Sequence, residues 1–211
     1  MTIMWQGHKF HEHIGSVGSQ DAAQWLGEQM KALLPDDVDR CRVGIYVATT
    51  DAAVDVSVSF WKAAINEGVD FVNPRDFPWT LASAIAAHAA RKVGIRGPCI
   101  TLVGGSEVAI AVLSHGIHDL QAGIIDLALV AGVDPSSADL EPRECPAAVI
   151  ALALDRKPCI ASVESCTETI EMDYSPHAAE TLLRACQAVE SCKDIVIGAP
   201  YEGKYLVCSE C

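Results

Sequence analysis

Two continuous apolar runs, separated by a helix-like pattern, dominate the hydrophobic profile between positions 97 and 134. Cys99 to Val103 is β-rich and closes at Gly104-Gly105, which predicts a buried strand ending in a tight turn. From Ser106 to Gly123, apolar residues recur every three or four positions, which predicts an amphipathic helix with Ser106 as its N-cap. Ile124 to Val133 is typical of a strand covered on both faces. Together these segments predict a parallel βαβ unit that presents Ser106 where open α/β sheets bind ligands.

The rest of the chain predicts further helices and strands around this unit. Predicted helices cover 21–34, 51–68, 80–93 and 176–190, and predicted strands cover 41–50, 147–154, 159–163 and 193–199, with one more short strand after 200. The strands 147–154 and 159–163 are expected to pair antiparallel across the turn between them. The segments 73–78 and 135–146 read as loops, and residues 1–20 show no steady period. We find no repeat or linker, so the pattern predicts one α/β domain with a mixed sheet layered with helices.

Several small, proline and acidic residues in the segment 97–134 and on both sides of it form a set with characteristic spacing. They are Gly97-Pro98, Thr101, the small residues before Ser106, Gly123, Asp126 and the ending ALVAGVD, with Phe77 to Ala82 upstream and Glu144 to Val149 downstream. This set resembles the nucleophile region of β-ketoacyl synthases, the condensing enzymes of the thiolase fold. The resemblance implies a truncated thiolase-like fold over residues 1–211, with its core at 41–165 and a partial start of the second half at 175–203.

One departure from the family lies at the centre of the resemblance. In β-ketoacyl synthases a cysteine at this helix terminus takes the acyl group, and two histidines from the second half promote decarboxylation and stabilise charge. The matched position here is Ser106, whose hydroxyl has a far higher pKa than a thiol and needs a neighbouring base to attack. The last histidine is His177, and the resemblance places both family histidines beyond it. We therefore expect no working catalytic residue.

The resemblance implies a non-catalytic subunit of the chain length factor type. Such a subunit pairs with a full-length ketosynthase as a heterodimer, shapes the acyl tunnel in polyketide or polyene biosynthesis, and meets acyl carrier protein through the complex. No cofactor is expected. Strand Cys99–Val103 is expected to be the interface edge, with the Ala-rich helix 80–93 beside it. The expected pocket and interface residues are Cys99, Ile100, Thr101, Leu102, Val103, Gly104, Gly105, Ser106, Phe77 and Trp79.

Three other functions remain open from the residues. Ser106 could be the nucleophile of an acyltransferase or hydrolase, activated by a histidine such as His115. The sequence GGSEV half-matches the hydrolase turn G-x-S-x-G, although Val108 stands at the last glycine. The chain could also be an acyl-binding homo-oligomeric module, or a regulatory or scaffolding protein.

Composition and charge limit the classes of partner and the cellular compartment that we expect for this protein. Half of the residues are hydrophobic and the mean hydropathy is +0.23, which predicts both a large interior and apolar surface buried against a partner. The formal net charge of −13 argues against nucleic acid and anionic membranes. No apolar run reaches about 18 residues and no signal pattern opens the chain, so we expect a cytoplasmic protein. The nine cysteines are expected to be reduced thiols, and His115 and His118 have no third ligand that would complete a metal site.

Overall fold

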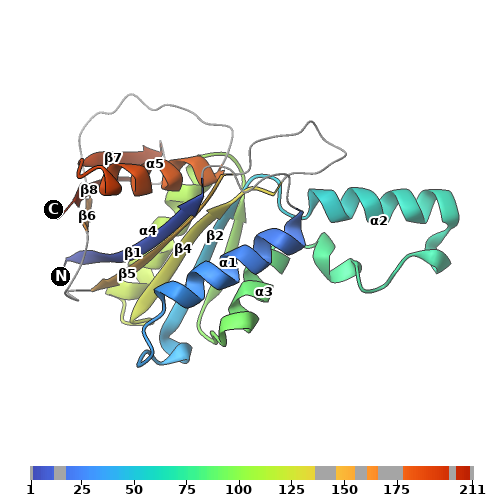
Figure 1. Cartoon of the computed structure of the whole chain (residues 1–211), viewed down its shortest axis with the longest axis horizontal. Helices are drawn as coiled ribbons and strands as arrows, with labels where there is room; N and C mark the ends of the chain where they lie inside the picture. Colours follow the sequence, from blue (N-terminus) through green and yellow to red (C-terminus); the bar gives the residue numbers. More distant parts are fainter. Residues whose placement is uncertain are drawn as a thin grey trace.

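A mixed sheet of eight strands forms the centre of the molecule (Figure 1). The computed structural model describes residues 2–11, 18–135, 146–154, 161–165, 178–199 and 203–209. The strands are β1 (Ile3–His11), β2 (Val43–Thr49), β3 (Cys99–Val103), β4 (Leu127–Val133), β5 (Ala147–Leu154), β6 (Ala161–Ser165), β7 (Ile195–Ala199) and β8 (Gly203–Ser209). Their order across the sheet is β3-β2-β4-β5-β1-β6-β8-β7.

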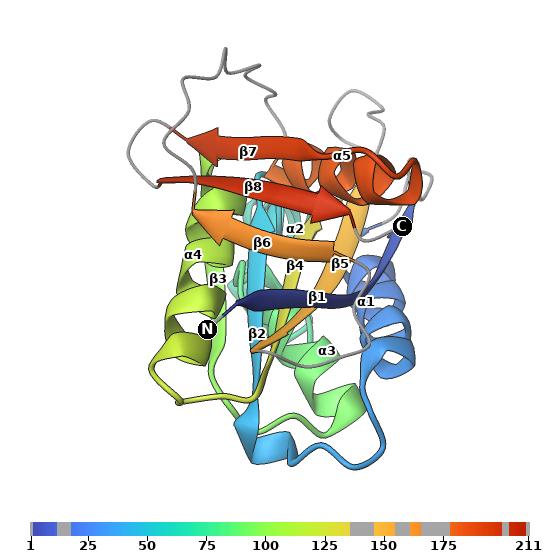
Figure 2. The same cartoon turned by 90° about the vertical axis from the view of Figure 1, so that its left-hand side faces the viewer.

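Helices cover both faces of this sheet, as Figure 2 shows with α4 on one side and α1 and α3 on the other. The α-helices are α1 (Ser19–Leu33), α2 (Val54–Glu67), α3 (Ala84–Val93), α4 (Glu107–Gln121) and α5 (Ala178–Glu190), and the 3-10 helices are η1 (Arg40–Arg42), η2 (Val69–Phe71) and η3 (Phe77–Thr80). Successive β2 residues point to opposite layers: Tyr46 packs with α4 and α5, and Ile45 with α1 and α3. The predicted α/β fold with a mixed, helix-layered sheet is confirmed.

The βαβ prediction is confirmed in its direction and corrected in its position. Both β3 and β4 run parallel to β2, but β2 lies between them. Strand β4 is buried along its whole length, as predicted. The prediction that β3 is buried is wrong, because β3 is the edge strand and both Cys99 and Val103 are exposed. An apolar strand with an unpaired edge is the feature that an interface would cover.

Strand β1 was not predicted, and it corrects the pairing expected for β5 and β6. Gly7, His8 and Lys9 interrupt the alternation that would have revealed a strand in this segment. β1 pairs antiparallel with β5 on one side and with β6 on the other. The expected β5–β6 hairpin is therefore wrong, because a segment from the start of the chain fills the place between the two strands.

The Ala-rich helix begins later than its pattern predicts and packs within the chain. Phe77–Thr80 forms η3, and α3 starts only at Ala84. Its small face contacts α1 so closely that a Cβ at Gly27 would lie 3.5 Å from the Cα of Ala89. The small side chains thus let α1 approach, and this face of α3 is covered by the chain itself.

Helix α2 projects away from the sheet together with the segment that follows it (Figure 1). None of its 14 residues is buried. Large hydrophobic side chains are exposed along α2 and the chain up to the start of α3: Trp61, Ile65, Val69, Phe71, Phe77 and Leu81. We call residues 54–82 the arm. Phe60 contacts Trp61 and Phe77 with ring centroids 6.1 Å apart in each pair, so the arm holds its own aromatic cluster.

The cysteines differ in state among the described residues. Cys186 is buried and free, and its burial raises the thiol pKa, as expected for a packed thiol. Cys192, in contrast, is disulfide-bonded, so the prediction of reduced thiols is wrong there. Within the described ranges, no helix has the length and apolar character needed to cross a bilayer.

The buried His8 predicts that stability falls as the pH is lowered. Its ring packs between Trp5 and Phe10, and Nε2 lies 3.4 Å from a Glu190 carboxylate oxygen. Desolvation lowers the pKa of His8. The negative charge of Glu190 raises it, but by less, so the pKa stays below its usual value. The unfolded chain therefore binds the proton more readily than the folded chain does below about pH 6.5. We expect the melting temperature to fall between about pH 7 and 5, and less steeply in His8→Gln; equal slopes would contradict this assignment.

Candidate functional site

Ser106 stands in the turn between β3 and α4, at the carboxyl end of the parallel strands. The turn is tied to the neighbouring strand because the Gly104 N–H donates to the Thr49 carbonyl over 3.0 Å. Ser106 is half-buried and already helical, with φ −59° and ψ −25°. It occupies the N-cap position as predicted, but its side chain makes no capping hydrogen bond, since a capping hydroxyl needs an extended backbone.

The carboxylate of Glu107 instead accepts a hydrogen bond from the turn that precedes the helix. The Gly105 N–H donates to Glu107 Oε1 over 3.0 Å. A Cβ at Gly105 would lie 2.7 Å from Glu107 Oε2, so the glycine makes room for the carboxylate. The negative charge offsets the positive end of the helix dipole and occupies a backbone donor of the turn. A developing alkoxide or oxyanion beside Ser106 would therefore meet like charge where the chemistry requires stabilisation.

The hydrolase reading of the turn conflicts with Val108. A Cβ at Gly104 would lie 2.7 Å from Val108 Cγ1, so the valine side chain fills the space beside the turn. A nucleophile elbow needs small residues there for close approach.

The histidine proposed as a base for Ser106 is too far along the helix. His115 follows Ser106 by nine residues, which corresponds to about 13 Å along an α-helix. His115 and His118 are both exposed on α4. The Ser106–His115 pair is therefore wrong, and His177 lies outside the described residues. Within the described ranges no three His, Cys, Asp or Glu side chains gather as a metal site would require.

The other predicted site residues divide between the β3 edge and η3. Ile100 and Leu102 pack against the core, and partial desolvation raises the pKa of the Cys99 thiol at the start of the strand. The Thr101 hydroxyl is buried and has no hydrogen-bond partner among the described residues. Phe77 is exposed in the arm, and Trp79 stacks on His88 of α3. The β3 edge and Trp79 therefore lie in different parts of the structure and do not form the single site that was predicted.

A buried carboxylate at the same end of the sheet ends the ALVAGVD segment, but it was not predicted as a site residue. Asp134 follows β4 and accepts hydrogen bonds from the Thr50 N–H at 2.5 Å and the Ala179 N–H at 3.0 Å. The Thr49 hydroxyl donates to it over 3.4 Å. Asp134 thus joins the ends of β2 and β4 to the first turn of α5, where a carboxylate suits the helix dipole. An acidic residue directly after a fully apolar strand was the available signal.

Asp126, one of the residues that carried the resemblance, has a structural role. Its carboxylate accepts two hydrogen bonds of 2.6 Å from the Arg42 guanidinium, which also donates to the Gly123 carbonyl over 3.1 Å. Arg42 holds the pKa of Asp126 below its usual range. The pair joins the start of β2 to the turn before β4.

Restoring the family's cysteine at position 106 is expected to give a sluggish thiol. Glu107 disfavours the thiolate, so Ser106→Cys should react slowly with iodoacetamide at pH 7. Adding Glu107→Gln keeps an acceptor for the Gly105 N–H but removes the charge, which should raise the rate about two- to fivefold. Mass spectrometry of the labelled peptide separates position 106 from native cysteines. Glu67→Gln, at the far end of α2, is the control; the same rate with either glutamine would contradict the role of Glu107.

Solved structures with this fold include several ketosynthases. "The ishigamide ketosynthase/chain length factor" has a TM-score of 0.58 at 16% identity, over 68% of this chain and 47% of that one. The ketosynthase ApeO in complex with its chain length factor ApeC, from Xenorhabdus doucetiae, has a TM-score of 0.58 at 12% identity. The match covers 78% of this chain and 60% of that one. A β-ketoacyl synthase from Burkholderia phymatum has a TM-score of 0.57 at 13% identity, over 70% and 46%. The match therefore covers only 46% to 60% of these chains.

No curated protein matches the sequence. The family described as "Beta-ketoacyl synthase, N-terminal domain" matches residues 25–165, which is most of the chain and includes the Ser106 turn, β4 and β5. Both the matched sequence and the thiolase-like arrangement of sheet and helices lead to the same assignment: the chain belongs to the β-ketoacyl synthase family and carries its N-terminal domain.

Proposed function

We propose that this chain is a non-catalytic, ketosynthase-like subunit that pairs with an active ketosynthase in polyketide or polyene biosynthesis. Structural neighbours described as a ketosynthase/chain length factor and as a ketosynthase with its chain length factor support this role. Another neighbour is a ketosynthase in complex with an acyl-carrier protein. In our proposal the chain helps to shape the acyl tunnel and meets the carrier protein only through the assembled pair. Residues 1–211 act as one domain, and the protein is cytoplasmic.

The observation that carries this proposal is the exposed apolar surface of the arm and of β3. Ile65, Phe71 and Val69 are 79%, 74% and 73% exposed, although each has a large hydrophobic side chain. Val103, at the end of the edge strand, is 55% exposed. Several large apolar side chains exposed on neighbouring segments are typical of a protein–protein interface. A second subunit would cover the arm and continue the sheet from the β3 edge.

The site at Ser106 supports a role in assembly over one in turnover. A hydroxyl stands at the nucleophile position, its proposed base is out of reach, and Glu107 places negative charge on the helix terminus. These features remove the activated nucleophile and weaken the stabilisation of an oxyanion. The paired ketosynthase would supply the reacting thiol.

Co-expression with a full-length ketosynthase from the same genome tests the proposal. We expect a stable complex on size-exclusion chromatography and condensation of acyl and malonyl groups only when both chains are present. The Ser106→Ala variant should support the same condensation rate as the unchanged chain. A chain that stays monomeric beside the ketosynthase, or that condenses acyl groups by itself, would overturn the proposal.

A further inference from the structure

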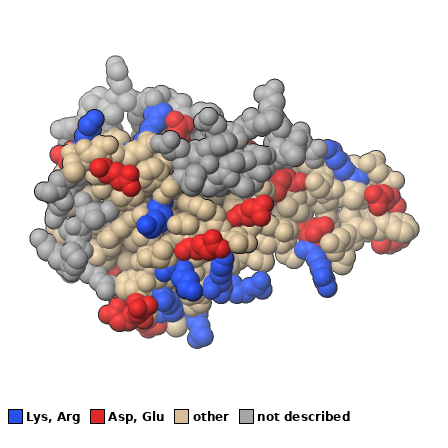
Figure 3. All heavy atoms as spheres, in the orientation of Figure 1, with Lys and Arg blue, Asp and Glu red and all other residues tan. Residues whose placement is uncertain are grey.

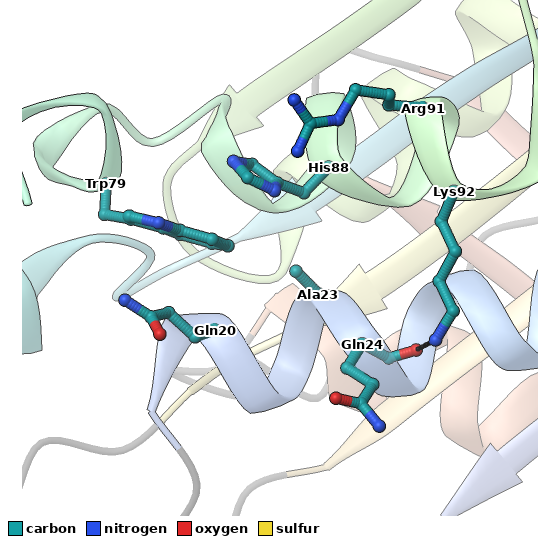
Figure 4. A pocket seen from close by; sticks show the side chains of 7 residues that line it. All are labelled: Gln20, Ala23, Gln24, Trp79, His88, Arg91 and Lys92. Carbon is teal, nitrogen blue, oxygen red and sulfur yellow. Dashed lines mark hydrogen bonds between the residues drawn. The ribbon is translucent and has the colours of Figure 1, made fainter. Parts of the chain in front are cut away.

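An open pocket of about 400 Å³ lies between α1 and α3 (Figure 4). Its lining consists of Gln20, Ala23, Gln24, Trp79, His88, Arg91 and Lys92. No residue of the Ser106 turn or of β3 contributes to it. Its volume lies within the range of about 300 to 1,000 Å³ that is common for small-molecule sites.

One wall of the pocket is aromatic. The rings of Trp79 and His88 stack with centroids 4.0 Å apart and an interplanar angle of 25°. Desolvation lowers the pKa of His88, and the neighbouring Arg91 charge lowers it further. The imidazole is therefore neutral at pH 7, and the pair offers a flat, uncharged surface that is only half-buried. Such a surface favours contact with another flat ring.

The pocket is also lined by one cationic side chain that has no carboxylate partner in the described part of the chain. Lys92 Nζ lies 3.0 Å from a carboxylate oxygen of Glu28, so its charge is paired. Arg91 is exposed, and among the described residues no hydrogen bond or ion pair involves its guanidinium. Figure 3 shows Lys and Arg side chains gathered around α3 on this face, in a chain whose formal net charge is −13. A guanidinium in this position suits a carboxylate or phosphate.

We propose that this pocket binds a small aromatic anion. The ring of the ligand lies against the Trp79–His88 pair, its carboxylate or phosphate accepts hydrogen bonds from Arg91, and the Gln20 amide offers a further polar contact. The pocket uses neither the Ser106 turn nor the β3 edge, so the inference does not depend on the subunit's role in a ketosynthase complex.

Calorimetric titration of the full chain, alone or in complex, tests the proposal with two probes. Benzoate carries a carboxylate on a ring, and adenosine monophosphate carries a phosphate beside one. We expect at least one of them to bind, and the neutral counterpart, benzamide or adenosine, to bind at least tenfold more weakly. The probe that binds identifies the anionic group that the pocket takes. Absence of binding by both probes at millimolar concentration would overturn the proposal.

Variants at Arg91, Arg96 and Trp79 separate this pocket from general anion binding. Arg91→Ala should weaken binding at least tenfold, whereas Arg96→Ala, which removes the same charge outside the pocket, should change it less than twofold. Trp79→Phe keeps a ring and should bind within about threefold of the unchanged chain, whereas Trp79→Ala should lose at least tenfold. Equal effects of the two arginine variants, or inorganic phosphate binding as tightly as the aromatic probe, would contradict the inference.

Discussion

Ile65→Asp is expected to weaken the complex with a ketosynthase roughly a hundredfold. Ile65 is 79% exposed on α2, so a carboxylate there leaves the fold of this chain intact. In the complex, the same carboxylate would be buried against apolar side chains without a partner, which costs several kcal/mol at an interface centre. The dissociation constant, measured by calorimetry with the purified ketosynthase, gives the size of the effect.

A matched variant at the other end of the sheet controls for the added charge. Ile124 is 50% exposed and precedes β4, whereas the arm follows the opposite, carboxyl end of β2. Ile124→Asp should therefore leave the dissociation constant within about twofold, as for a substitution outside the interface. If both aspartate variants bind equally well, the arm is not the contact surface.

Asp134→Ala is expected to lower the free energy of unfolding by about 3 kcal/mol. The substitution leaves the half-buried Thr50 N–H and the buried Ala179 N–H without their acceptor, and each unsatisfied buried donor costs about 1–3 kcal/mol. It also removes the charge at the first turn of α5. Backbone relaxation has little room here, because a Cβ at Gly132 would lie 2.5 Å from the Ala179 Cα. Urea unfolding followed by circular dichroism measures the loss.

Two further variants separate the hydrogen bonds of Asp134 from its charge. Asp134→Asn keeps one acceptor oxygen and should cost less than Asp134→Ala, at about 1–2 kcal/mol. Asp70→Ala removes an exposed carboxylate of η2 and should stay within about 0.5 kcal/mol of the unchanged chain. An Asp134→Ala variant as stable as Asp70→Ala would show that α5 does not depend on this carboxylate.

Local sequence patterns correctly predicted those elements whose type and burial follow from their own residues. Strand β4 is apolar throughout and proved to be buried on both faces, and α4 follows directly from the three-and-four spacing after Ser106. Strand β1 escaped prediction because its outward and inward positions do not alternate cleanly. Its place between β5 and β6 depends on contacts with segments more than 130 residues away, which no local pattern contains.

At the candidate site, too, some properties could be predicted from the sequence and others required the structure. The presence of a hydroxyl at the family's nucleophile position is a fact of the sequence, read from the spacing around Ser106. The separation of Ser106 and His115 follows from their spacing in the predicted helix. The hydrogen bond from the Gly105 N–H to Glu107, in contrast, emerged only from the backbone conformation of the turn, because it depends on where atoms lie in space.

By itself, the sequence determined the α/β class, the family and the replacement of a nucleophile by Ser106, because periodicity and spacing are properties of the chain alone. Only the tertiary structure decided which apolar residues remain exposed. Cys99–Val103 and α2 are as apolar as buried elements, yet β3 has a neighbour on one side only and α2 extends beyond the sheet. Burial is set by what packs against a residue, so an apolar strand became core in β4 and an exposed edge in β3.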